Sequence, residues 1–225
     1  MRRIINPPGK GPDQATMAGF EALLKIMSPS CVVADSQERS GVLRSGIRPL
    51  FEARFVGTAL TVRLYPGDLV DCLDALSVAQ KGNVIMVDAA GETETSIWGG
   101  LMAGLCLQKG VVGAVVDGAI RDTDEIKSLK FPIFSRAIVP RSTHSPYSKR
   151  LEPIEVNVPI QCATVMVSPG DVVLADEIGV VVVPQKEAAD VLKRAQDQAA
   201  QEEATRQRIR QGKTVEELLA EFGRL

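Results

Sequence analysis

The sequence predicts an α/β fold in which helices pack against a mixed, barrel-like sheet. In the first half of the chain, apolar stretches of strand length alternate with stretches of helical periodicity, which is typical of helices that cross over a sheet. In the second half, short strand-like segments follow one another, separated by turn signals such as residues 168–171 and 176–179. This spacing is typical of a barrel or a curled mixed sheet.

Length and composition agree with an ordinary globular α/β protein. The chain has 225 residues, of which 45% are apolar, 24% are charged and only 4% are aromatic, so Val, Ile, Leu and Ala must form the core. We expect a single domain over residues 1–225. Within it, residues 1–12 form an N-terminal arm rich in Pro and Gly, and residues 186–225 form a C-terminal helical extension.

The expected elements follow from the pattern of apolar residues. In the first half, helices are expected at residues 13–27, 69–80 and 97–109, and strands at 31–35, 55–64, 84–88 and 111–116. In the second half, strands are expected at 134–139, 154–158, 164–167, 172–175 and 179–183, followed by helices at 186–211 and 215–222.

The long helix at 186–211 is highly charged, and its apolar positions form only a thin stripe. Such a helix is either solvated or packed across a subunit boundary. We favour the second, because a free polar helix of this length has little to stabilise it.

Charge and residue usage exclude several classes of function. The net charge is −2 and aromatic residues are few, so no nucleic-acid partner is expected. No apolar run is long enough for a signal peptide or a membrane span, which predicts a cytoplasmic protein without a membrane partner. The four scattered cysteines predict buried free thiols, and the single histidine, His144, excludes a multi-histidine metal site within one chain.

The strongest candidate for chemistry is the segment that follows the apolar strand ending near Ile120. Arg121 offers a planar fork suited to a carboxylate, and Asp122 suits a hard divalent cation. If a helix starts at Asp122, Glu125 lies on the same face and approaches the same ion. The alternative is an ion pair that caps this helix.

A second candidate is Gly99-Gly100, which precedes the helix containing Leu101 and Met102. Glycines at the start of a helix allow backbone N–H groups to approach an anion, although a tight turn or close helix packing is the more common reason for them.

Other polar residues carry less weight. Asp88 and Asp117 end apolar strands and are interpreted as turn formers that bond their own backbone. Nothing shows that Lys109 or Lys149 is buried enough to form a Schiff base, and His144 lies in a Pro/Ser-rich segment typical of a surface loop.

Several separated motifs resemble the RraA-like family. They are Gly100, Arg121-Asp122 and Glu125, with supporting segments at 82–88, 117–122, 131–136 and 169–181. This family includes class II 4-hydroxy-4-methyl-2-oxoglutarate aldolases, which also decarboxylate oxaloacetate, and regulators of ribonuclease E activity. The resemblance implies a swivelling β/β/α-type domain that assembles as a homotrimer or homohexamer, with sites at the subunit boundaries.

The resemblance also implies roles for the candidate residues. The backbone amides of Gly99, Gly100, Leu101 and Met102 would bind the carboxylate of a small 2-oxo acid. Arg121 would bind the oxo-acid oxygens and, with Asp122, form the catalytic pair. Asp122, assisted by Glu125, would hold Mg²⁺ or Mn²⁺.

The function implied is a divalent-metal-dependent lyase. It would cleave a C–C bond of small 2-oxo dicarboxylic acids, as an aldolase or an oxaloacetate decarboxylase, and release pyruvate through a stabilised enolate. The alternative is a non-catalytic regulator that binds a ribonuclease or another protein. Glu125 favours the enzyme, since a regulator does not need a competent pair of metal-binding carboxylates.

Overall fold

The computed structural model describes residues 3–65, 72–143 and 154–223. Its helices are α1 (Gln14–Leu23), α2 (Pro29–Ser36), α3 (Gly100–Lys109), α4 (Thr123–Ser128), α5 (Ala188–Arg210) and α6 (Val215–Phe222), with 3₁₀ turns η1 (Leu73–Ser77) and η2 (Gln185–Glu187). Its strands are β1 (Ile4–Ile5), β2 (Arg48–Pro49), β3 (Phe55–Leu64), β4 (Asn83–Trp98), β5 (Gly113–Ile120), β6 (Ile133–Ile138), β7 (Ile154–Val156), β8 (Ile160–Cys162), β9 (Val165–Val167), β10 (Val172–Ala175) and β11 (Val180–Val183).

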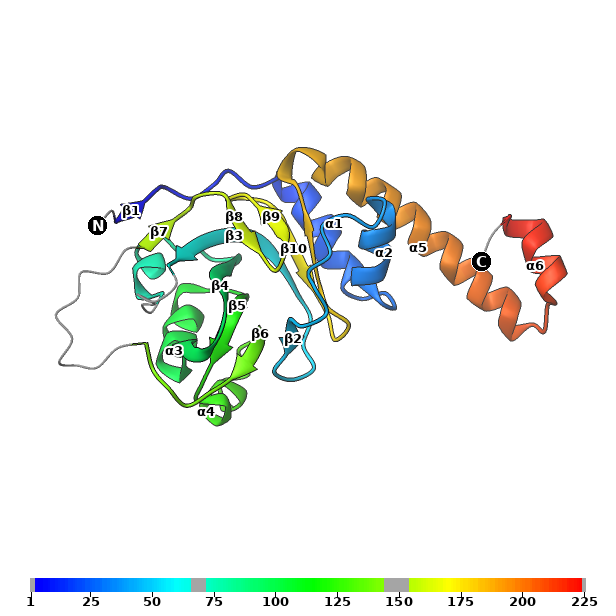
Figure 1. Ribbon diagram of the computed structural model, residues 1–225. Coiled ribbons are helices and arrows are strands. Elements are labelled where there is room, and N and C mark those ends of the chain that lie inside the picture. Colours follow the sequence, from blue (N-terminus) through cyan, green and yellow to red (C-terminus); the bar gives the residue numbers. More distant parts are fainter. Residues whose placement is uncertain (1–2, 66–71, 144–153, 224–225) are drawn as a thin grey trace.

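A mixed sheet forms the body of the protein (Figure 1). Strands β3, β4, β5 and β6 run parallel and side by side, and β2 closes one edge. Strand β3 is shared: its first half pairs with β10 and its last residues pair with β7, both antiparallel. Because one strand has different partners along its length, the sheet curls, as the sequence predicts for its second half.

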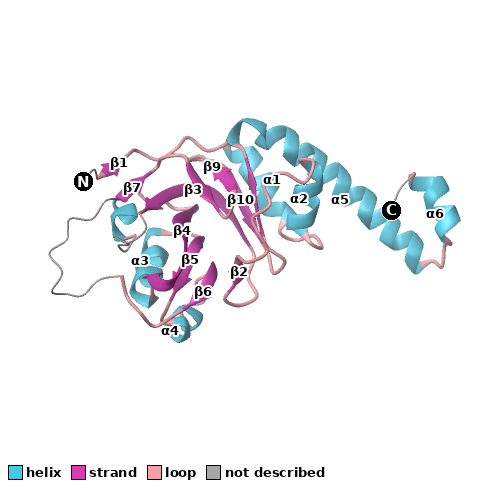
Figure 2. Ribbon diagram, in the orientation of Figure 1, coloured by secondary structure: helices cyan, strands magenta, loops and turns pink. Residues whose placement is uncertain are grey.

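The core is divided by the sheet into three apolar clusters. One lies between the parallel strands, α3 and η1; a second lies within the curl, beneath β8 and β9; a third lies between β10–β11 and the helices α1, α2 and α5. All residues of β5 are buried, as expected for a central parallel strand covered on both faces. Figure 2 shows α3 and α4 beside β4–β6, and α1, α2 and α5 at the other end of the molecule.

Helix α5 has two different halves. Val191, Leu192 and Ala195 near its start are buried against α1 and α2. The C-terminal half extends away from the body and ends beside α6 (Figure 1). Helix α6 begins with a capping box, in which Thr214 and Glu217 bond each other's backbone N–H groups.

The predicted α/β class, with a mixed sheet flanked by helices and a long C-terminal helix, is confirmed. One predicted element is wrong: residues 31–35 form part of helix α2, not a strand. Pro29 at its first position favours a helix start, and a five-residue apolar run cannot distinguish a buried helix from a buried strand.

Other boundaries also differ from the prediction, and two of these differences are large. The strand expected at 84–88 continues to Trp98, so the helix expected from residue 97 begins only at Gly100. Of the helix expected at 69–80, residues 73–77 form a 3₁₀ turn, and residues 69–71 lie outside the described residues.

Candidate active site

The two sequence candidates meet at one edge of the sheet. Strands β4 and β5 are parallel neighbours whose ends are in register, with Trp98 opposite Ile120. The chain leaves β4 through Gly99 and leaves β5 through Arg121, whose backbone N–H donates to the Trp98 carbonyl at 2.9 Å. The N-terminus of α3 and the Arg121-Asp122 pair therefore lie side by side, at the carboxyl ends of the strands where ligands bind in α/β folds.

Close packing explains the two glycines. A Cβ atom at Gly99 would overlap Asp122 Oδ2 and lie 3.4 Å from Arg121 Nε. A Cβ atom at Gly100 would overlap the Glu125 carboxylate and lie 2.8 Å from Glu125 Cγ. Both positions are occupied by glycine because the acidic side chains of the neighbouring segment fill the space that a larger residue would need.

Asp122 connects the two segments. Its Oδ2 accepts a hydrogen bond from the Gly100 N–H at 3.2 Å and lies 3.6 Å from Arg121 Nε. Its backbone is left-handed, with φ 52°, and its side chain makes no cap hydrogen bond to α4. The ion pair with Arg121 exists, but the Asp122 carboxylate faces α3 and does not cap its own helix.

The first turn of α3 also offers donors. The Gly100 N–H is taken by Asp122, and the Ala103 N–H bonds the Gly99 carbonyl. The N–H groups of Leu101 and Met102 have no acceptor within the helix, because the first N–H groups of any helix have none. Of the four amides predicted to bind a carboxylate, these two are the best placed to do so.

A cavity of about 330 Å³ lies beside these groups. It is lined by apolar residues, three hydroxyl side chains and the charged pair: Leu73, Ser96, Ile97, Trp98, Gly99, Leu101, Met102, Arg121, Asp122, Ser142 and Thr143. The side chains of Arg121 and Asp122 are 41% and 40% exposed, so both are accessible to a small molecule.

The carboxylates suit a hard cation that keeps open coordination positions. In the parts of the chain that the structure describes, no group of three His, Cys, Asp or Glu side chains could hold a metal. Asp122 lies against Gly99 and accepts the Gly100 N–H, while Glu125 lies against Gly100, and both supply oxygen donors only. Mg²⁺ is commonly bound by one or two carboxylates, with waters and substrate completing its shell, so this pair fits such an ion. Glu125 is not part of the cavity wall.

The remaining sequence candidates lie elsewhere. Asp88 accepts the Ala90 N–H at 3.0 Å, as predicted for a turn former, and burial raises the pKa of its carboxyl. The prediction for Asp117 is wrong: it is buried, accepts the Ala163 N–H at 2.7 Å and forms an ion pair with Arg136. The Asp117 carboxylate therefore binds residues that lie far from it in the chain, and such contacts cannot be predicted from sequence spacing.

Lys109 lies exposed in the last turn of α3. His144 and Lys149 lie outside the described residues. Cys106 and Cys162 are buried free thiols as predicted, and Cys72 is buried too, whereas Cys31 is exposed.

Sequence reasoning missed Trp98 as part of the cavity wall. It is 2% exposed, its ring stacks on Phe131 with centroids 6.0 Å apart, and its indole N–H has no hydrogen-bond partner among the residues that the structure describes. Its position directly before Gly99 was the one feature of the sequence that could have indicated a place in this cavity wall.

Comparison with known proteins agrees with this geometry. The model of the RraA-like (Aldolase/RraA) family matches residues 30–182, which include every candidate site residue. The chain belongs to the RraA-like family. A Halalkalibacterium halodurans protein, provisionally named 4-hydroxy-4-methyl-2-oxoglutarate aldolase, is 37% identical over 182 residues, which cover 80% of this chain and 84% of the relative.

Two solved structures share this RraA-like fold. An uncharacterized protein from Pseudomonas syringae is 28% identical, with a TM-score of 0.79, and the match covers 93% of this chain and 99% of that one. A Streptomyces coelicolor member of the RraA family of RNase ES inhibitors is also 28% identical, with a TM-score of 0.72, covering 88% and 99%. Among the described residues, no helix is long and apolar enough to cross a membrane.

Proposed function

We propose that this RraA-like protein is a divalent-metal-dependent lyase that cleaves a C–C bond of small 2-oxo dicarboxylic acids and releases pyruvate. The single observation that carries the proposal is the meeting of the α3 N-terminus with Arg121 and Asp122 in the wall of one cavity. Glu125 lies next to this pair, against Gly100. The name of the Halalkalibacterium halodurans relative supports the aldolase form of this activity.

The protein's own groups would bind and orient the substrate. The N–H groups of Leu101 and Met102 would bind the carboxylate next to the 2-oxo group, where the positive end of the helix dipole favours an anion. The Arg121 guanidinium would then donate to the oxo oxygen. The apolar wall formed by Ile97 and Trp98 would exclude water from one side of the reacting carbons.

Breaking the bond between C3 and C4 of the substrate leaves the enolate of pyruvate, with negative charge on the oxo oxygen. Arg121 would stabilise this charge as it develops, and the loss of one such donor typically costs about a hundredfold or more in rate. A Mg²⁺ or Mn²⁺ ion held by Asp122 and Glu125 would supply further Lewis-acid stabilisation of the same charge. Decarboxylation of oxaloacetate passes through the same enolate and needs no base for a 4-hydroxyl group, so we propose it as a second activity of the site.

We also propose that the protein acts as a homotrimer or homohexamer. The C-terminal half of α5 projects away from the body (Figure 1), and Ile209, Val215 and Leu219 near its end are exposed apolar residues. A second copy of the chain would cover them.

The test is pyruvate release from a panel of 2-oxo acids, coupled to lactate dehydrogenase, with Mg²⁺ and after removal of metal by EDTA. We expect activity on 4-hydroxy-4-methyl-2-oxoglutarate or oxaloacetate that EDTA abolishes and Mg²⁺ or Mn²⁺ restores. Activity that survives EDTA and is trapped by borohydride would indicate a lysine Schiff base instead. No pyruvate from any substrate would favour the alternative, a regulator that binds a ribonuclease, as the name of the Streptomyces coelicolor relative suggests.

A further inference from the structure

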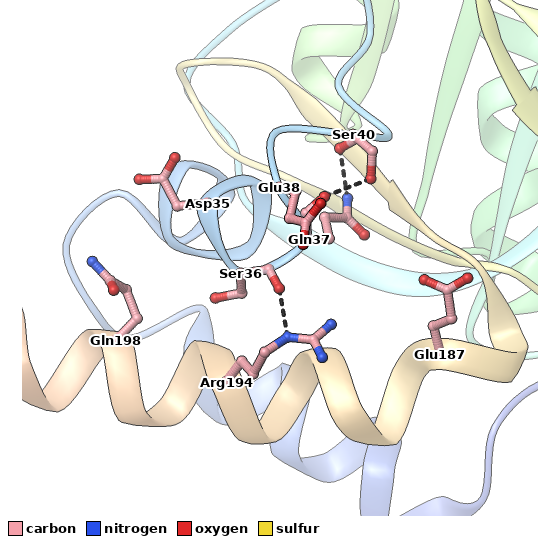
Figure 3. Close-up of a pocket in the computed structure, with 8 residues that line it drawn as sticks. All are labelled: Asp35, Ser36, Gln37, Glu38, Ser40, Glu187, Arg194 and Gln198. Carbon is pink, nitrogen blue, oxygen red and sulfur yellow. Dashed lines mark hydrogen bonds between the residues drawn. The ribbon is translucent and has the colours of Figure 1, made fainter.

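A second pocket, of about 620 Å³, lies between the C-terminal end of α2, the turn after it and the first half of α5 (Figure 3). Its lining is entirely polar: Asp35, Ser36, Gln37, Glu38, Ser40, Glu187, Arg194 and Gln198. It shares no residue with the cavity beside Arg121, so the proposed lyase reaction does not account for it.

Gln37 supplies an unpartnered acceptor to this pocket. The residue is only 5% exposed, and its amide nitrogen donates to the carbonyls of Ser40 and Val182 at 2.8 and 3.0 Å. Its Oε1 is itself buried and has no hydrogen-bond partner among the described residues. Figure 3 shows this oxygen pointing away from Ser40, toward the space above α5 between Arg194 and Glu187. Since a buried acceptor without a donor is unfavourable, the site favours a ligand that brings one.

Arg194 supplies unused donors on the opposite wall. Its Nε donates to the Ser36 carbonyl at 2.7 Å, which fixes the guanidinium over the pocket (Figure 3). Its two terminal nitrogens bond no acceptor in the described residues. A guanidinium held in this way matches the geometry of a carboxylate.

The charge of the wall is unbalanced. Asp35, Glu38 and Glu187 form no ion pair with any described residue, and Arg194 is the one cationic side chain among the lining residues. A ligand whose carboxylate binds Arg194 is therefore still surrounded by acidic side chains. The pocket favours a ligand that also carries positively charged groups.

We propose that this pocket binds a basic amino acid of the lysine or ornithine type. Its carboxylate pairs with Arg194, its α-ammonium donates to Gln37 Oε1 and Glu187, and its side-chain ammonium lies among the remaining carboxylates. A diamine has no carboxylate to bind Arg194, and a simple carboxylic acid has no ammonium group to donate to the Gln37 oxygen. Neither ligand therefore binds both sides of the pocket.

Isothermal titration of the full-length protein with L-lysine tests this assignment. We expect saturable binding of L-lysine, weaker binding of L-alanine, and at least about tenfold weaker binding of cadaverine, which lacks the carboxylate, and of Nα-acetyl-lysine, which lacks the α-ammonium. Absence of saturable binding up to about 10 mM L-lysine, corresponding to an affinity weaker than that of typical metabolite sites, would overturn the proposal.

Matched variants locate the binding. Arg194→Gln and Glu187→Gln replace exposed residues on or beside α5, and each should weaken the binding of L-lysine at least about tenfold. Lys193→Gln and Asp190→Asn, on the same helix but outside the pocket lining, should bind as the wild type does. Gln37→Met, checked for folding by its melting temperature, removes the acceptor. Unchanged binding by both Arg194→Gln and Glu187→Gln would refute the site even if L-lysine binds elsewhere.

Discussion

Replacing Gly100 with alanine should displace the Glu125 side chain while leaving the free energy of unfolding nearly unchanged. The added Cβ would overlap the Glu125 carboxylate and lie 2.8 Å from its Cγ, so the side chain must move by about 1 Å or more. Because Glu125 is exposed, this movement costs little folding energy. Alanine is favoured over glycine in a helix by up to about 1 kcal/mol, so we expect the free energy of unfolding to change by no more than about 1 kcal/mol in either direction.

The activity of Gly100→Ala should respond much more strongly. A displacement of about 1 Å in an active site can lower the rate about a hundredfold, and we expect a loss of this order in kcat/KM for pyruvate release. Gly104→Ala in the same helix is the matched control. Its Cβ would lie 3.8 Å from Leu129 Cδ1, an ordinary contact, so this variant should be as stable as the wild type or more so and fully active.

The assay for this comparison is coupled pyruvate release, measured beside urea unfolding of both variants. If folded Gly100→Ala keeps its kcat/KM within about twofold of the wild type, the position of Glu125 does not matter to the reaction. The metal role proposed for Glu125 would then be wrong.

Three further predictions test other parts of the account. Arg121→Ala should lower kcat/KM for pyruvate release about a hundredfold or more without altering the circular dichroism spectrum, and retention of more than about a tenth of the activity would remove Arg121 from the mechanism. Deleting residues 201–225, the projecting part of α5 with α6, should reduce the assembly to a smaller species in light scattering; an unchanged mass would show that this segment forms no subunit contact. Burial raises the pKa of Asp88 above 3.8, so its ionisation favours the unfolded state and stability falls as pH rises through the raised value. Asp88→Asn should therefore melt higher than the wild type at pH 7, and equal melting temperatures at pH 7 would contradict the assigned burial.

The sequence predicted the parallel half of the sheet for identifiable reasons, and it drew attention to the segment after β5 as a candidate site. Strands β3 and β5 are mostly apolar runs of strand length, and Arg121-Asp122 directly follows β5. Gly99 meets Asp122 because β4 and β5 are parallel neighbours whose ends lie at one edge of the sheet, and this required the continuation of β4 to Trp98 that the sequence did not predict.

What the sequence did not predict depends on contacts between distant segments. Helix α2 was mistaken for a strand because its buried face is decided by α5, far along the chain. Asp117 was assigned to a local turn, yet its partners are Arg136 and Ala163. Gln37 gave no signal at all, because only the fold shows that one of its two amide atoms is satisfied and the other is not.

The central claim is that Arg121 and Asp122 together bind a small oxo acid and a divalent cation. Titration calorimetry with oxalate, a planar dianion that resembles the enolate of pyruvate, tests it without depending on turnover. We predict that oxalate binds in the presence of Mg²⁺, that EDTA abolishes the binding, and that Asp122→Asn and Arg121→Ala each weaken it. Oxalate binding that is equally strong with and without Mg²⁺ in all three proteins would contradict the account.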